Sequence, residues 1–525
     1  MPNVKLLDCT LRDGGYINQW QFGQQAIKDI LFDLSVSHMD IIECGFFKDG
    51  ANDPGSSLFA GTEHASEVIP NEGSNMFVAM IAIGEMELDP AKLSDASAGH
   101  IGGVRLTFHQ HEIEKSFAYG QVLKNKGYKL FMQPVGGTHY SDKEMIDLVE
   151  KINALNPYAF YLVDTLGMMY PKDLLRQFYL VDHNLAPGIC VGYHSHNNLQ
   201  MAFANAQALV EKAHDREVII DCSCNGMGRG AGNLCTELFM DYMNRFHAAS
   251  YDILPVLEII DQYLVPIQLS TPWGYSPAYY LSAAERCHPN YAGFLMTNRS
   301  MNIRTVASIL DQIEPAQRHH FNKKLITKLY ADYQDNAIDD LEAINDLRHK
   351  IAGRDVLVLA PGQSMIKYAK EIEDYIKTHQ PFVIAVNFIP DFETNMIFIG
   401  NNLRFDELFA KLDLSKAVLT SNIKNAPQHA TLVNYSDLTN PSPEASDSSG
   451  IMVLKLLIKL SVSHAALAGY DGFSRNQVNN YAESSMAGLS DPAALKEKSL
   501  AMQEQLKICA QKLSLKFITP TRYHI

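Results

Sequence analysis

The sequence predicts an α/β protein composed of a TIM (β/α)8 barrel, a helical segment and a Rossmann-like α/β domain. Eight short apolar runs alternate with helical patterns through the first part of the chain, and polar side chains follow most of these runs. Alternating strands and helices begin again near Gly353. The length of 525 residues fits two or three domains, because a single core rarely serves so long a chain.

The barrel is predicted for residues 1–280 from the spacing of its strands. Strands are expected at Val4–Asp8, Met39–Glu43, Met76–Ile81, Gly103–Thr107, Lys129–Pro134, Ala159–Asp164, Cys190–His194 and Val218–Asp221. Eight βα units are the number that closes a barrel. An open doubly wound sheet fits the same strands, but it would spread the polar side chains at the strand ends along a crevice, so we favour the closed barrel.

The polar side chains at the strand ends are the first sign of function. They are Asp13, Glu43, Arg105, Thr107, Gln133, Asp164, Thr165, His194, His196 and Asn225. The active site of such a barrel lies at the carboxyl face of its strands. We therefore expect these residues to converge although they are distant in the sequence.

Residues 281–350 show helical patterns without strand-like alternation. Helices are expected at Ile303–Ile313, Phe321–Tyr333 and Asn336–Arg348. The segment either extends the carboxyl face of the barrel or connects two domains, and connection is the default interpretation.

Residues 351–525 are predicted to form the second α/β domain. Expected strands are Asp355–Leu359, Phe382–Val386, Met396–Ile399, Lys416–Thr420 and Thr431–Val433, and a helix is expected at Ile451–Leu460. Alternating strands and helices indicate a parallel, Rossmann-like sheet.

Composition excludes several classes of function. A net charge of −15 argues against a nucleic-acid or anionic-membrane partner. Eight scattered cysteines fit a reducing, cytoplasmic setting. The chain shows no signal peptide, and its most apolar stretch, Ile451–Tyr470, carries lysines, so we expect a packed helix and no membrane span.

Asp13, His194 and His196 are residue types that hold a catalytic divalent metal. His194 and His196 lie two positions apart, so at the end of a strand their rings point to the same side. Two imidazoles and one carboxylate leave coordination positions open for a 2-oxo acid, whose enolate the ion would stabilise. Arg12 could neutralise the developing charge. Such a ligand set suits Mn²⁺ or Mg²⁺, with Zn²⁺ and Co²⁺ also possible.

Residues 4–280 resemble the metal-dependent pyruvate aldolase and hydroxymethylglutaryl-CoA lyase-like superfamily, and above all barrels of the 4-hydroxy-2-oxovalerate aldolase type. The matching segments are Asp8–Gly14, Asp40–Glu43, Tyr161–Gly167, His194–His196 and Gly226–Asn233. The resemblance implies that Asp13, His194 and His196 are metal ligands, with Asn233 at or near the metal. It also implies Arg12 as the enolate-stabilising group, Glu43 as its supporting partner, and Thr165 as a contact of the substrate carboxylate. Arg105 and Tyr275 are further candidates for substrate binding.

Two departures from the family pattern leave the proton-transfer residue open. Tyr16 stands where the most similar aldolases carry a histidine, the expected general base. A tyrosine has an ordinary pKa of about 10, so Tyr16 would need help from the metal or Arg12 to act as a base. The cysteine of the lyase branch is also missing from Met227–Arg229. His109, His111, His139 and Tyr275 are the other candidates.

The glycine-rich run Gly226–Gly232 has two interpretations. Such runs often cradle a phosphate, and barrels commonly place a phosphate site after the eighth strand. The resemblance instead implies a loop that closes over the metal site. In either case Arg229 is a candidate contact for a substrate phosphate.

The second domain carries a weaker signal. The turn Ala360–Ser364 faintly resembles the nucleotide-binding turn of sialyltransferase-like proteins, although it lacks the full dinucleotide spacing. The candidate nucleotide-binding residues are Gly362, Ser364, Asn387 and Ser449. Both a nucleotide-sugar binding module and a degenerate structural domain remain open.

The leading hypothesis is a divalent-metal-dependent aldolase or lyase acting on a 2-oxo acid, pyruvate in the first place, with a sugar aldehyde as one possible acceptor. One alternative is a Claisen-type acyl transferase of the isopropylmalate synthase kind. Gly15–Tyr16 replaces the Glu-Gln typical of that branch and favours the aldolase. The other alternative is a non-catalytic sugar- or nucleotide-binding protein. A homo-oligomer is expected in each case.

Overall fold

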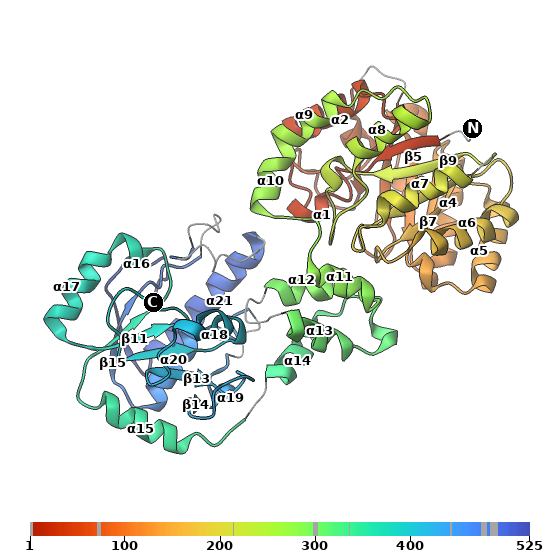
Figure 1. Ribbon diagram of the computed structural model, residues 1–525. Coiled ribbons are helices and arrows are strands. Elements are labelled where there is room, and N and C mark those ends of the chain that lie inside the picture. The colour runs from red at the N-terminus through yellow and green to blue at the C-terminus, as the bar shows by residue number, and fades with distance from the viewer. Residues whose placement is uncertain are drawn as a thin grey trace. The chain divides into compact units, whose positions relative to one another are not determined.

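The computed structural model describes residues 4–70, 75–213, 215–297, 303–334, 337–440, 444–473, 480–482 and 492–525. The chain divides into two compact units (Figure 1). The first contains residues 1–292 and 315–321, and the second contains residues 293–314 and 322–525. Residues 281–350 therefore contribute to both units.

The first unit is a closed parallel barrel, as predicted. Strand β1 pairs with both β2 and β9, which closes the sheet order β1-β9-β8-β7-β6-β5-β4-β2. The barrel strands are β1 (Val4–Asp8), β2 (Ile41–Phe47), β4 (Met76–Ala82), β5 (Ile101–Phe108), β6 (Lys129–Pro134), β7 (Ala159–Asp164), β8 (Cys190–Ser195) and β9 (Val218–Cys222). All eight predicted strands are confirmed. A further short strand, β3 (Leu58–Phe59), pairs with the end of β2 and was not predicted because two residues show no periodicity.

Helices cover the outside of the barrel strands (Figure 1). They are α2 (Gln24–Val36), α3 (Thr62–Ser66), α4 (Ile113–Asn125), α5 (Asp142–Leu155), α6 (Pro171–Asn184), α7 (Ala202–Lys212) and α8 (Thr236–Phe246), whereas the short helix α1 (Gly15–Asn18) lies in the loop after β1. The connection from β4 to β5 departs from the regular pattern, because its described residues form only short 3₁₀ turns at Pro90–Lys92 and Ala96–Ala98.

The barrel interior is filled by side chains from alternate positions of its strands. Leu7, Ile41, Val78 and Phe131 belong to one buried interior cluster, whereas Leu6 packs outward with the helix layer. Glycine makes room where a large ring turns inward. A Cβ on Gly192 would lie 2.2 Å from the ring of Tyr161. This close approach lets the Tyr161 hydroxyl donate a hydrogen bond to Asp221, at 3.0 Å.

Four helices follow the last barrel strand and α8, and a later segment, residues 315–321, packs back on the first unit. They are α9 (Leu254–Ile259), α10 (Val265–Ser270), α11 (Pro277–Ala284) and α12 (Pro289–Thr297). Residues 315–321 then pack on the first unit, where the Tyr291 hydroxyl donates to the carbonyl oxygens of Gln317 at 2.9 Å and His320 at 2.7 Å. The His288 N–H donates to the Arg318 carbonyl at 2.7 Å. These bonds bring two histidines at 319 and 320 back to the barrel.

The second unit contains a seven-stranded parallel sheet in the order β14-β13-β12-β11-β10-β15-β16, which confirms a following α/β domain. Its strands are β10 (Val356–Leu359), β11 (Phe382–Val386), β12 (Met396–Ile399), β13 (Ala417–Thr420), β14 (Thr431–Val433), β15 (His464–Ala468) and β16 (Ser514–Phe517). Both faces of β10 are covered, since Val356 and Val358 belong to one apolar cluster and Leu357 and Leu359 to another.

The helices of the second unit are α13 (Ile303–Asp311), α14 (Lys323–Gln334), α15 (Leu341–Ile351), α16 (Ser364–Lys367), α17 (Ala369–His379), α18 (Asn402–Leu408), α19 (Tyr435–Leu438), α20 (Ser449–Lys459) and α21 (Pro492–Ala510). Helix α15 begins at Leu341, later than the predicted Asn336, which lies outside the described residues. Strand β16 and helix α21 were not predicted.

The first half of the most apolar stretch, Ile451–Tyr470, forms α20, which is packed inside the second unit, but its second half forms strand β15 and not the predicted helix. Ile451, Met452, Leu454 and Leu457 are fully buried. Within the described ranges, no helix is long and apolar enough to cross a membrane.

Candidate metal centre and active-site cavity

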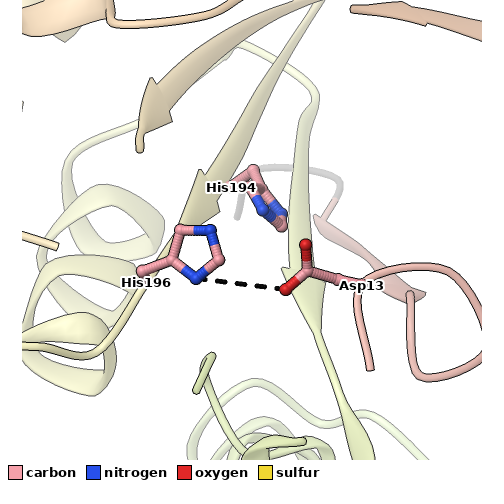
Figure 2. Close-up of side chains that lie close together, drawn as sticks. All are labelled: Asp13, His194 and His196. Carbon is pink, nitrogen blue, oxygen red and sulfur yellow. Dashed lines mark ion pairs between the residues drawn. The ribbon is translucent and has the colours of Figure 1, made fainter. Parts of the chain in front are cut away.

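Asp13, His194 and His196 converge at the carboxyl face of the barrel (Figure 2). Asp13 lies in the loop after β1, His194 lies in β8, and His196 follows the end of β8. One ligand atom of each residue lies within 4.8 Å of the others, and all three side chains are buried. The Asp13 Oδ2 and His196 Nδ1 atoms are 3.9 Å apart. The sequence prediction that these three residues meet is therefore consistent with their geometry.

The turn after β1 is fixed by backbone bonds. The N–H groups of Arg12 and Asp13 both donate to the Cys9 carbonyl, at 3.1 and 2.8 Å. The Trp20 indole N–H donates to the Arg12 carbonyl at 2.8 Å. Gly14 is required here because a Cβ would lie 2.3 Å from the Thr10 carbonyl. The turn thus holds Arg12 and Asp13 in fixed positions above the barrel.

His194 is oriented by a buried carboxylate. Its Nδ1 lies 3.0 Å from Asp221 Oδ2, which leaves Nε2 as the ring atom available to a metal. Asp221 also accepts from the Tyr161 hydroxyl at 3.0 Å and from Arg105. Burial would raise the pKa of the Asp221 carboxyl, but Arg105 and His194 together outweigh this effect and lower the pKa, so Asp221 stays ionised. A carboxylate behind a ligating histidine fixes the ring and raises its basicity.

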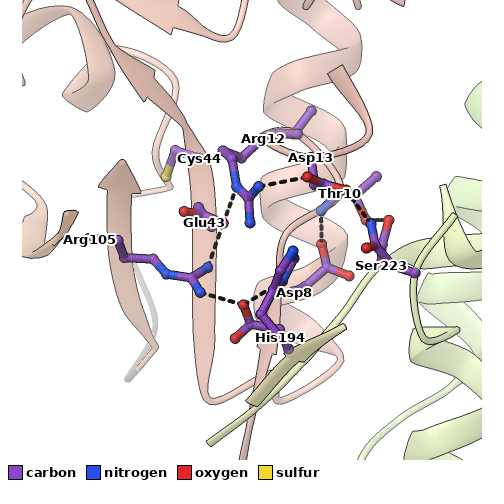
Figure 3. A network of polar contacts seen from close by, with 12 residues as sticks. Asp8, Thr10, Arg12, Asp13, Glu43, Cys44, Arg105, His194 and Ser223 are labelled. Carbon is purple, nitrogen blue, oxygen red and sulfur yellow. Dashed lines mark hydrogen bonds and ion pairs between the residues drawn. The ribbon is translucent and has the colours of Figure 1, made fainter. Parts of the chain in front are cut away.

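Arg12 is held by two carboxylates (Figure 3). Its Nε donates to Glu43 Oε2 at 2.9 Å, and its Nη1 donates to Asp13 Oδ1 at 2.7 Å. Arg105 Nη1 donates to the same Glu43 oxygen at 2.6 Å. The Arg12 Nη2 group is buried and has no hydrogen-bond partner among the described residues. The Arg12 guanidinium is therefore held by two carboxylates and keeps its Nη2 donor available.

The buried residues fit a divalent cation. Three carboxylates (Asp13, Glu43 and Asp221) face two guanidiniums (Arg12 and Arg105), which leaves one net negative charge in this network. Burial would raise the pKa of Asp13, but Arg12 and the imidazoles lower it below its ordinary value. Burial lowers the pKa of His196 to about 3, so its ring is neutral and has a lone pair to share. A divalent cation requires ionised carboxylates and neutral imidazoles as ligands, and a net negative charge around it stabilises the ion.

Asn233 completes this group. Its Nδ2 donates to Asp13 Oδ2 at 2.6 Å, while its buried Oδ1 has no partner within the described part of the chain. A Cβ on Gly228 would lie 2.2 Å from Asn233 Nδ2 and 2.6 Å from Asp13 Oδ2. The glycine-rich loop therefore lies directly against the candidate metal centre. An oxygen without a partner beside Asp13 supports Asn233 as a ligand.

A cavity of about 340 Å³ opens over these residues. Its lining includes the predicted residues Arg12, Asp13, Tyr16, Thr107, His109, Gln133, Thr165, His194, His196 and Arg229, together with Phe46, Glu85, His288, His319 and His320. The cavity therefore combines the candidate metal ligands with a set of histidines from the loops.

Four site residues predicted for the barrel do not line the cavity, and one of them is Asn233, which is buried beside Asp13. Glu43 and Arg105 are fully buried beneath it and act on Arg12 and Asp221. Tyr275 is 60% exposed and lies outside the lining. A positioning role for Glu43 and Arg105 fits these contacts.

The histidine candidates for proton transfer also separate. His109 lines the cavity, and its Nε2 lies 3.8 Å from Glu85 Oε1. The His111 side chain is 74% exposed and lies outside the lining, as does His139, whose ring stands 3.4 Å from that of His319. Of the three, His109 is the one that reaches the cavity.

Tyr16 lies between aromatic and cationic neighbours. Its ring centroid is 4.8 Å from that of Trp20, and the Arg229 guanidinium lies 5.0 Å from it on the ring face. Burial raises the pKa of Tyr16, although Arg229 opposes this effect. The phenol therefore keeps its proton and can donate a hydrogen bond, but it is a poor base.

Sequence reasoning missed Asp221, His288, His319 and His320. Asp221 carried a usable signal, since it ends a predicted strand just as Glu43 does. The three histidines carried none, because they lie in the segment that follows the barrel, and His319 and His320 reach the cavity only through the return of residues 315–321.

The four residues predicted to bind a nucleotide in the second unit form two groups. A Cβ on Gly362 would lie 2.3 Å from the Gly469 carbonyl, and the Ser364 N–H donates to Asp471 Oδ2 at 2.7 Å. Asn387 Oδ1 accepts from the Gly400 N–H at 3.0 Å, and Ser449 Oγ also lies against Gly400. Asp471 already occupies the N-terminus of α16. Nucleotide binding by these residues remains a prediction.

Comparison with known proteins identifies the class. Residues 109–258 match the HMGL-like family. The 4-hydroxy-2-oxovalerate aldolase of Chloroflexus aurantiacus is 26% identical over 306 residues, covering 55% of this chain and 87% of that protein. The enzyme of the same name from Chloroflexus aggregans is 28% identical over 312 residues, with the same coverage. Among solved structures, the N-terminal domain of a Bacteroides vulgatus protein provisionally described as an aldolase has a TM-score of 0.47 and 22% identity, over 56% of this chain and 96% of that one.

Residues 109–258 therefore carry an HMGL-like domain, and the barrel is similar in sequence to proteins named 4-hydroxy-2-oxovalerate aldolase.

Proposed function

We propose that the chain cleaves or forms the carbon–carbon bond between a 2-oxo acid and an aldehyde, and that pyruvate is the preferred 2-oxo acid. The observation that carries the proposal is the meeting of Asp13, His194 and His196 with the free Nη2 donor of Arg12 in one cavity. The aldolase relatives support it.

Asp13, His194, His196 and the Asn233 oxygen would hold a divalent cation, and that ion would polarise a bound 2-oxo group as a Lewis acid. Arg12 would donate from Nη2 to the same oxygen as it gains negative charge. Because Glu43 and Asp13 already fix the guanidinium, this donor needs no reorganisation during the reaction.

Thr165 would bind the carboxylate of the 2-oxo acid. Its Oγ1 accepts from the Gly136 N–H at 3.0 Å, so the hydroxyl proton remains available to a substrate. Thr165 lines the cavity with Arg12. The hydroxyl therefore gives the donor substrate a second contact.

We assign the proton-accepting role to His109, with Tyr16 as a hydrogen-bond donor to the acceptor oxygen. The interaction with His109 lowers the pKa of Glu85, and this effect is larger than the opposing effect of burial. The Glu85 carboxylate therefore stays ionised beside the imidazole. An ionised carboxylate next to a histidine stabilises the imidazolium that forms when the ring accepts a proton.

Replacing His109 with glutamine should lower kcat by about 100-fold, the lower end of the range for a general base, because water also reaches this partly exposed ring. The measurement is steady-state release of pyruvate from a 4-hydroxy-2-oxo acid. His111→Gln is the matched control, since His111 is a neighbouring histidine outside the cavity lining. An unchanged kcat in His109→Gln would assign proton transfer to another residue.

Removal of the metal tests the proposal as a whole. Protein treated with EDTA should lose pyruvate release with 4-hydroxy-2-oxo acids, and reloading with Mn²⁺ or Mg²⁺ should restore it. Parallel assays with acetyl-CoA should show no thiol release, which separates an aldolase from a Claisen-type acyl transferase. Identical rates before and after metal removal would contradict the mechanism.

A further inference from the structure

The cavity contains two arginines with different electrostatic surroundings. Arg12 forms ion pairs with Asp13 and Glu43. Arg229 forms no ion pair with any carboxylate within 4.0 Å in the described part of the chain, and its buried Nε has no hydrogen-bond partner there. Its guanidinium instead lies on the ring of Tyr16. The charge of Arg12 is compensated by contact and that of Arg229 is not.

The loop around Arg229 is fixed. Gly228 lies against Asp13 and Asn233, and the Ala231 N–H donates to Asn198 Oδ1 at 2.8 Å. Gly230 has a φ of +69°, and a Cβ there would lie 2.7 Å from the same Asn198 oxygen. The Arg229 backbone is therefore held between two tightly packed glycines beside the candidate metal centre.

The groups that face Arg229 do not neutralise it. The charge of Arg229 lowers the pKa of Glu85, but the Glu85 carboxylate lies beside His109 instead, and its side chain is 60% exposed. Burial, and then the charge of Arg229, lower the pKa of His288 well below its ordinary value. His288 Nδ1 accepts from the Asn290 N–H at 3.1 Å, so its neutral ring carries the proton on Nε2 and offers a donor. Arg229 is thus accompanied by a neutral donor.

The cavity is also larger than a small 2-oxo acid requires. Its volume of about 340 Å³ lies within the range of about 300–1,000 Å³ typical of sites for drug-sized ligands. Pyruvate bound next to Arg12 and Thr165 would fill only part of this volume. The lining also includes Arg229, Glu85, His109 and His288.

We propose that Arg229 binds an anionic group, a carboxylate or a phosphate, on the aldehyde acceptor, with His288 as an accompanying donor. This inference rests on the proposed aldol reaction and names the class of acceptor: an acidic or phosphorylated aldehyde in preference to a neutral one. A guanidinium without an acid partner, beside a donor and inside a cavity, is suited to such a group.

The test compares matched aldehydes with saturating pyruvate and metal-loaded, full-length enzyme. Butyraldehyde is paired with succinic semialdehyde, and glyceraldehyde with glyceraldehyde 3-phosphate. The wild-type enzyme should prefer the anionic member of at least one pair by about 10–100-fold in kcat/KM, the range expected for one hydrogen-bonded charge. The pair that shows the preference identifies carboxylate or phosphate.

Arg229→Gln should reduce that preference to nearly one, and Arg229→Lys should retain part of it. Arg245→Gln is the control, because Arg245 is an exposed arginine on α8 paired with Asp241. Calorimetry with the unreactive analogues succinate and glycerol 3-phosphate gives a second readout, and affinity should fall in Arg229→Gln but not in Arg245→Gln.

The outcomes separate the two proposals. Turnover of pyruvate with equal kcat/KM within both pairs, or equal analogue affinity in wild type and Arg229→Gln, overturns the role of Arg229 alone. A higher KM for pyruvate in Arg229→Gln, with the aldehyde preference intact, assigns Arg229 to the 2-oxo acid and also overturns it. Absence of turnover with every aldehyde overturns the proposed reaction together with this inference.

Discussion

Arg12→Lys should lower kcat by about 100–1000-fold, the range for loss of one preorganised oxyanion donor. Lysine keeps the positive charge, so Glu43 and Asp13 retain a counter-ion. It cannot reproduce the planar fork that bonds both carboxylates and still presents Nη2 to the cavity. The measurement is kcat for pyruvate release, with metal content determined on the same sample.

The choice of lysine matters for this test. Arg12→Gln would leave the buried Asp13 carboxylate without a contacting guanidinium and Glu43 with Arg105 alone, and breaking a buried pair costs about 3–5 kcal/mol. Loss of activity in that variant could therefore reflect unfolding. A kcat for Arg12→Lys within threefold of wild type, at full metal content, would contradict the assignment of Arg12.

His196→Ala should bind no stoichiometric metal and should lose at least about 1000-fold in kcat, because the Lewis-acid contribution amounts to several kcal/mol. His196 is neutral and buried, and its Nδ1 has no partner in the described residues, so its removal deletes a ligand without breaking another bond. Metal content is measured by elemental analysis after dialysis. His183→Ala, an exposed histidine on α6, is the control.

Asp221→Asn gives a graded comparison for the same site. It leaves all candidate ligands in place but replaces the carboxylate behind His194, so metal affinity should fall about 10–100-fold rather than vanish. Full metal occupancy in both His196→Ala and Asp221→Asn would place the metal elsewhere.

The barrel could be predicted because most residues of each strand are buried, so the strands are rich in apolar residues. Strands β1, β6 and β7 were predicted with their observed bounds. The same logic found Asp13, His194 and His196, since polar residues at strand ends stand out against apolar runs. Helix α21 and strand β16 were missed because both are partly exposed. Strand β16 alternates polar and apolar residues, but it has only four of them.

The loop side of the cavity could not be predicted in the same way. His319 and His320 reach it through tertiary contacts of the segment that holds them, and no local pattern encodes such contacts. Arg229 was visible as a candidate, but its lack of an acid partner depends on which neighbours the fold brings near it. The fold determines these electrostatic surroundings, and a single sequence does not display them.

The return of residues 315–321 to the first unit has a consequence for synthesis of the chain. The ribosome completes β9 at Cys222 before it reaches His319 and His320. That interval is roughly 100 residues, or about 5–20 s at ordinary elongation rates, and domains fold as they emerge. The nascent barrel can therefore bring Asp13, His194 and His196 together before the part of the cavity wall that contains His319 and His320 is synthesised, and ions can reach these candidate ligands before that wall forms.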